Sequence, residues 1–64
     1  RYQHLYAALN RLPDKERTSV LLYYMEGYSI KEVAAITEVS ADAVRQHLAR
    51  GRVHLRGLLG SPRS

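Results

Sequence analysis

The chain has 64 residues, a net charge of +4 and no Cys. A chain this short forms at most one domain and buries only about 60% of its unfolded surface. Without Cys it has neither a disulfide nor a thiolate-bound metal. No apolar run approaches the roughly 20 residues of a membrane span, and no secretory signal pattern is present, so we expect a cytoplasmic protein. The first residue is Arg1 rather than Met, which indicates a piece of a longer protein.

The first two helices are expected at about 2–11 and 13–26. Apolar residues recur at helical spacing in the first segment. Pro13 suits the first position of the second helix, where its missing N–H is no loss. The run 20–25 is apolar nearly all round, which predicts that this is the central helix. Gly27 fits the left-handed position that ends a helix.

The third and fourth helices are expected at about 30–37 and 41–58. Ser29 and Glu32 have the spacing of a capping box, in which each side chain satisfies a backbone N–H of the first turn. Ser40 suits the N-cap of the fourth helix. No stretch alternates with period two for long enough to form a strand, so the sequence predicts an all-α domain of four helices.

The fourth helix has one apolar side, formed by Val44, Leu48, Leu55 and Leu58 at helical spacing. Gly51 lies among them and costs about 1 kcal/mol relative to alanine in a helix. We therefore expect another backbone to approach the helix closely at Gly51.

Charge is distributed unevenly along the chain. Residues 1–44 carry five basic and six acidic side chains, whereas residues 45–64 carry five Arg and no acid. A short helix, a tight turn and a basic second helix are typical of a helix-turn-helix, whose second helix fits the DNA major groove. We assign residues 1–59 to this DNA-binding domain and expect 60–64 to be a disordered tail. An ordinary solvated helix face is the alternative interpretation of the charge.

Four residues of the basic helix are candidates for contacts with DNA bases. With the apolar side turned inward, Gln46 and Ala49 point away from the core, and Arg45 and Arg50 flank them. Arg pairs with guanine O6 and N7, Gln pairs with adenine N6 and N7, and Ala can contact a thymine methyl group. Ordinary surface polarity is again the alternative.

Other polar residues are candidates for contacts with the DNA backbone, which fix position without reading sequence. Basic residues further along the fourth helix can reach phosphates, and backbone N–H groups at helix starts favour anions. The candidates are Arg52, Arg56 and His54 on the fourth helix, with Ser29, Lys31 and Ser40 at the helix starts.

Chemistry beyond binding is not predicted. His47 and His54 are two turns apart on one helix, about 10 Å along the axis, which is too far to share one metal. No nucleophile motif, Ser-His-Asp set or glycine-rich phosphate loop is present. We therefore expect no metal, no cofactor, no small-molecule substrate and no enzyme activity.

Three motifs cover most of the chain. They are Leu12-Pro13-x-x-x-Arg17, then Tyr24-x-x-Gly27-x-Ser29-x-x-Glu32-Val-Ala34, then Ser40-x-x-x-Val44-Arg45-x-x-Leu48-x-Arg50-x-Arg52-x-x-Leu55. Together they resemble region 4 of bacterial sigma factors, most of all the extracytoplasmic-function (ECF) group, over about residues 5–58. The Leu-Pro-x-x-x-Arg opening and the late Arg-x-Arg favour this family over the output domains of response regulators.

The resemblance implies recognition of double-stranded promoter DNA at the −35 element during transcription initiation. It also implies docking on the β-subunit flap of RNA polymerase, through apolar residues of the first two helices and part of the fourth, and masking of that surface by an anti-sigma factor. The base-reading positions of the family fall on the four candidates named above. Its backbone-contact positions fall on Arg17, Lys31 and Arg52.

The sequence departs from the family pattern in and after the turn. Glu38 stands where Gly is common, which predicts a strained or altered turn. Asp42 and Ala43 replace the common Gly-Thr, and an acid at this place either repels phosphate or accepts from cytosine N4. Ala49 is smaller than the usual side chain, and His47 stands where Lys or Arg is common.

Two other functions remain open at this point. The first is the output domain of a response regulator, which shares the DNA-binding chemistry but dimerises on paired half-sites. The second is a helical adaptor whose basic helix meets an acidic protein. Binding to one asymmetric site beside a −10 element excludes the first, and failure to bind any DNA at low salt favours the second.

Overall fold

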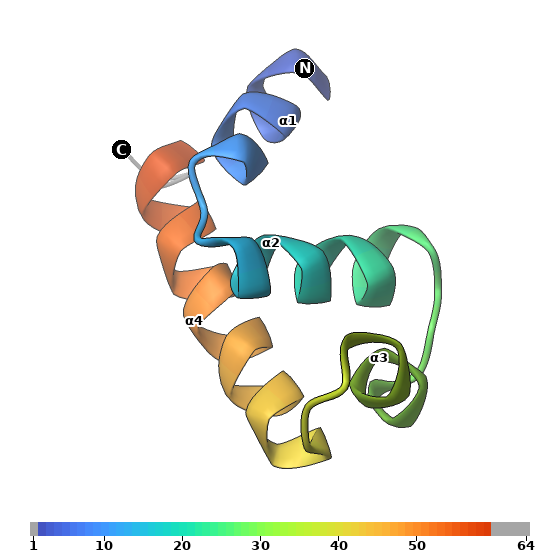
Figure 1. The fold of residues 1–64 in the computed structure, drawn as a ribbon. Coiled ribbons are helices and arrows are strands. Elements are labelled where there is room, and N and C mark those ends of the chain that lie inside the picture. The colour runs from blue at the N-terminus through green and yellow to red at the C-terminus, as the bar shows by residue number, and fades with distance from the viewer. Residues whose placement is uncertain (1, 60–64) are drawn as a thin grey trace.

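The computed structural model describes residues 2–59, all of whose regular elements are helical (Figure 1). The expected all-α fold with four helices is confirmed, with one segment of altered hydrogen bonding. The expected tail, 60–64, lies outside the described residues. The elements in chain order are α1 (Tyr2–Asn10), α2 (Asp14–Val20), η1 (Leu21–Met25), α3 (Ile30–Thr37) and α4 (Ala41–Leu59).

Helix α4 spans the molecule, and the other helices pack along it (Figure 1). Helix α2 crosses its middle, α3 lies against its N-terminal half, and α1 lies towards its C-terminal end. Thus α1 and α3 occupy opposite sides of α2. Helices α1, α2, α3 and α4 all contribute residues to the buried core. Its apolar residues are Leu9, Leu12, Val20, Val33, Val44 and Leu48.

The second helix differs from the single α-helix expected over 13–26. It begins at Asp14, because Pro13 has an extended ψ of 151° and acts as the N-cap. Its last part, η1, is a π-helix, in which the N–H of Glu26 donates to the carbonyl of Leu21 at 3.0 Å. Segments of this kind are rare and often occur at functional sites.

The end of this helix is more exposed than its apolar run predicted. Tyr24 and Met25 have exposed fractions of 52% and 39%, although the run is apolar nearly all round. The wider π turn changes the direction of these side chains relative to a regular α-helix. Gly27 then ends the segment with φ of 81°, which confirms the expected left-handed residue.

Helix α3 has the bounds and the cap that the sequence predicts. The Ser29 hydroxyl accepts from the N–H of Glu32 at 3.0 Å, and the Glu32 carboxylate accepts from the N–H of Ser29 at 2.8 Å. The helix ends at Glu38 in the left-handed conformation, with φ of 60°. The N–H of Val39 donates to the Ala34 carbonyl at 3.1 Å and closes the turn. The strained turn expected at Glu38 is confirmed.

The apolar side of α4 is buried except at its C-terminal end. Val44, Leu48 and Gly51 are buried and Leu55 is partly buried, but Leu58 is 40% exposed. Leu58 thus is not buried as expected: it lines a hollow with Ala7 and Ala8 of α1 but stays partly exposed there. At Gly51 an added Cβ would lie 2.8 Å from Cγ2 of Val20, which confirms the close approach of α2.

Candidate nucleic-acid interface

Helices α3 and α4 form a helix-turn-helix with a short, well-capped turn. The Ser40 hydroxyl accepts from the N–H of Ala43 at 3.0 Å, which begins α4 directly after the turn. Val33 on α3 and Val44 on α4 are fully buried and fix the two helices against each other. The opposite side of α4 therefore faces outward.

The four predicted base-contacting residues lie on this outward side. Arg45, Gln46, Ala49 and Arg50 are all exposed, and at about 100° per residue they lie within roughly 140° of arc around α4. We call these four residues the reading face. An α-helix that presents Arg and Gln in its first turns can hydrogen-bond base edges in the major groove.

Arg45 has a partner within the described residues that the sequence analysis did not assign. Its Nη1 donates to Oδ1 of Asp42 at 2.8 Å, and both side chains are largely exposed. The spacing of three residues on one helix is a local signal for such a pair. The Asp42–Arg45 pair could therefore have been predicted from the sequence.

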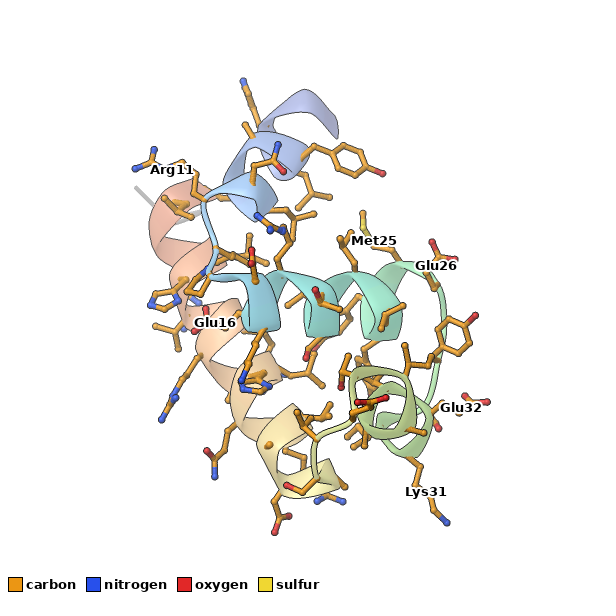
Figure 2. The ribbon with its side chains drawn as sticks, viewed as in Figure 1. Arg11, Glu16, Met25, Glu26, Lys31 and Glu32 are labelled. Carbon is orange, nitrogen blue, oxygen red and sulfur yellow. The ribbon has the colours of Figure 1, made fainter. Side chains whose placement is uncertain are left out.

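Four of the predicted backbone contacts are exposed at a helix start or along α4. Ser29 and Lys31 lie at the start of α3, and Lys31 points away from the helical bundle (Figure 2). Ser40 lies at the start of α4, and Arg56 is exposed nearer its C-terminal end. Of these residues, Ser40 directly precedes the first turn of α4, the part that would enter the major groove.

The other two predicted backbone contacts have partners elsewhere. Arg17 forms an ion pair with Asp14 and donates to the carbonyl of Asn10 at 3.4 Å, which holds it on the α1 side of α2. Arg52 donates through Nη1 to the hydroxyl of Tyr24 on η1 at 2.9 Å. Arg17 and Arg52 thus each have a partner outside α4, and their contact with the DNA backbone stays a prediction.

His54, a further candidate for phosphate contact, faces α2 instead. Its Nδ1 lies 2.5 Å from Oε1 of Glu16, whose side chain is buried. The contact lies at the crossing of α2 and α4 near Gly51. It gives the buried carboxyl group of Glu16 a hydrogen-bond partner, as a buried polar group requires. The two residues are 38 apart in sequence, so no local pattern predicts this pair.

A second surface lies on the α1 side of the molecule. An apolar groove runs between α1, the end of the second helix and the C-terminal half of α4, and Met25 stands at its edge (Figure 2). We call it the apolar groove. Its lining residues are Leu5, Leu9, Val20, Tyr24, Met25 and Leu55.

Residues 2–59 contain no group of three or more His, Cys, Asp or Glu side chains that could hold a metal ion. Among these residues no helix combines the length and the apolar character needed to cross a membrane.

The capped turn, the buried inner side of α4 and its basic outer side define a helix-turn-helix domain of the nucleic-acid-binding class. The family described as Sigma-70, region 4 matches residues 2–55 of the chain. The chain belongs to the sigma-70 region 4 family.

Several sigma factors are similar to the chain. The ECF RNA polymerase sigma factor SigM of Mycobacterium tuberculosis is 42% identical over 53 residues, which cover 83% of the chain and 27% of that protein. The RNA polymerase sigma factor CarQ of Myxococcus xanthus is 40% identical over 58 residues, 91% of the chain and 33% of that protein. FliA of Escherichia coli is 34% identical over 58 residues, 91% of the chain and 24% of that protein. The chain thus spans a quarter to a third of these relatives.

Proposed function

We propose that this domain recognises the promoter −35 element as part of an ECF sigma factor that directs RNA polymerase to promoters. One observation carries the proposal: Arg45, Gln46, Ala49 and Arg50 are all exposed on the side of α4 opposite its buried residues. The family match and the similarity to SigM and CarQ support the sigma role over a response-regulator output domain or a protein adaptor.

In the proposed complex the N-terminal half of α4 lies in the major groove, which is about 12 Å wide and admits one helix. Arg45, Gln46, Ala49 and Arg50 contact base edges. Backbone phosphates are contacted by Ser29, Lys31, Ser40 and Arg56. Arg17 and Arg52 are the remaining proposed phosphate contacts, because each guanidinium keeps N–H donors besides those bonded to Asp14, Asn10 and Tyr24.

The apolar groove is the proposed docking surface for the polymerase. The groove is lined by exposed Tyr24 and Met25 beside buried Leu9 and Val20. Exposed apolar surface of this kind is typical of a protein-binding site. The β-subunit flap of RNA polymerase is the proposed occupant, and an anti-sigma factor would inhibit by covering the same groove. The proposed role is binding in the cytoplasm, without catalysis, cofactor or small-molecule substrate.

Two substitutions on the reading face test the proposed DNA function. Arg45→Ala and Arg50→Ala each remove donors to base edges, and one good bidentate contact contributes about 1–3 kcal/mol of discrimination. We expect each variant, as the full-length protein with polymerase core, to lose about tenfold in −35 discrimination. Competition binding against promoters with altered −35 elements measures this.

Arg11→Ala is the matched control, because Arg11 is exposed at the end of α1 near the C-terminal end of α4 (Figure 2). It removes the same charge away from the reading face, so −35 discrimination should stay unchanged. Unchanged discrimination in both reading-face variants would reject the assignment.

A further inference from the structure

Asp42 is an acidic side chain in the middle of the proposed reading face. It lies in the first turn of α4, and its side chain is 86% exposed. At about 100° per residue it falls between Arg45 and Gln46 around the helix axis. No acid follows it in the sequence. The Asp42 carboxylate would therefore enter the DNA major groove together with the Arg and Gln side chains that contact bases.

A carboxylate is unexpected on a DNA-binding surface, because DNA phosphates repel it. Its presence in the reading face therefore has to be explained by some favourable effect. Stability is a weak reason: an exposed ion pair such as Asp42–Arg45 contributes about 0–1 kcal/mol. The pair does bear on geometry. Oδ1 accepts from Nη1 of Arg45 at 2.8 Å, which favours one orientation of a long side chain before DNA arrives and lowers part of the ordering cost of binding.

The pair leaves donors and acceptors for two neighbouring bases. A guanidinium has five N–H donors, so Arg45 keeps donors for guanine O6 and N7 while it bonds to Asp42. A carboxylate has two acceptor oxygens, so Oδ2 of Asp42 can accept from a second donor. In the major groove the amino group of cytosine N4 is a donor that suits Asp.

We propose that Asp42 is a specificity-determining residue of this domain. It orients Arg45 towards guanine and accepts a hydrogen bond from cytosine N4 in an adjacent base pair. Bases that present only acceptors there, guanine or thymine, leave the carboxylate facing an acceptor and are rejected. This inference rests on the proposed −35 recognition and adds one base preference to it.

A helix-end effect is the competing explanation, because an acid in the first turn favours the positive end of the helix dipole by about 0.3–1 kcal/mol. A second acidic residue in the chain, Asp14, serves to distinguish this helix-end effect from a role of Asp42 in specificity. Asp14 also lies in the first turn of its helix, is 88% exposed and pairs with an Arg three residues on. Neither residue of that pair belongs to the reading face, and its Arg17 also donates to the carbonyl of Asn10 at the end of α1.

The test uses the full-length protein bound to polymerase core and a promoter library with randomised −35 positions. The wild type, Asp42→Asn, Asp14→Asn and Arg45→Ala are compared by sequencing bound DNA. For the wild type we expect cytosine to be preferred next to the guanine whose preference Arg45→Ala abolishes. Because Asn pairs with adenine, Asp42→Asn should lower the cytosine preference about tenfold and move it towards adenine. Asp14→Asn should match the wild type.

Three outcomes would overturn the inference, and they differ in what they say of the proposed function. If Arg45→Ala changes the preferred bases and Asp42→Asn does not, the role of Asp42 fails and −35 recognition stands. If Asp42→Asn and Asp14→Asn shift preference alike, the effect is one of charge or helix stability. If the wild type prefers no base at the −35 positions, the proposed function fails and this inference fails with it.

Discussion

At the scale of single residues, Glu38 shows that local strain is retained in the turn before α4. Its φ of 60° and ψ of 40° place it in the left-handed region, which costs a side chain about 1–2 kcal/mol relative to glycine. The side chain is exposed, so burial does not offset this cost. The conformation is instead imposed by the turn that joins two packed helices.

Replacing Glu38 by glycine should therefore stabilise the domain. We expect Glu38→Gly to raise the free energy of unfolding by about 1 kcal/mol, because glycine adopts this conformation without the Cβ clash. Chemical denaturation measures the change. Glu26→Gly is the control: Glu26 is also exposed and follows a helix, but its φ is −95°. It should give no gain, and a less stable Glu38→Gly protein would contradict the strain argument.

At the scale of elements, the crossing of α2 and α4 sets the direction of the recognition helix. Gly51 lets the two helices approach, since an added Cβ would lie 2.8 Å from Cγ2 of Val20. Beside it, the contact between Glu16 and His54 links the same two helices through side chains. Packing and a part-buried hydrogen bond thus act at one place to hold α4 across α2.

Adding a methyl group at this crossing should destabilise the domain. In Gly51→Ala the gain in helix propensity, about 1 kcal/mol, is opposed by overpacking, which typically costs about 1–3 kcal/mol. We expect a net loss of about 1 kcal/mol on thermal or chemical unfolding. Gly57→Ala adds the same group to the same helix where nothing lies within 4 Å of the new Cβ. That control should gain stability, and equal gains in both variants would refute a tight crossing.

The sequence predicted those elements whose signals are local. The capping box of Ser29 and Glu32 and the periodic apolar side of α4 lie within a few residues, so helix bounds and the outward position of Arg45 follow from them. Long-range partners leave no such signal. Arg52 and Tyr24 are 28 residues apart, and only the packed structure shows that they bond. The π-helix at the end of the second helix likewise has no pattern of its own, because its run is apolar on every side.

At the scale of the whole molecule, the two proposed binding surfaces lie at different ends of α4. The reading face occupies its N-terminal half beside α3, whereas the apolar groove adjoins its C-terminal half beside α1 (Figure 1). Their chemistry also differs, since one is polar and basic and the other is apolar. A substitution in the groove should therefore affect polymerase binding and leave base preference unchanged.

Met25→Asp tests this separation of surfaces. It places a charge in the apolar groove, where a partner must desolvate it, so we expect the affinity of the full-length protein for polymerase core to fall about tenfold. Tyr28→Asp is the control, because Tyr28 has the same exposed fraction as Met25, 39%, and does not line the groove. Titration of a labelled protein with core enzyme measures the affinity, and circular dichroism checks that both variants fold.

Equal losses of affinity in the two variants would place the polymerase contact outside the apolar groove, because Met25 lines this groove and Tyr28 does not. At high protein concentration some Met25→Asp protein still binds the core enzyme. If these complexes keep the −35 preference of the wild type, the apolar groove and the reading face act independently.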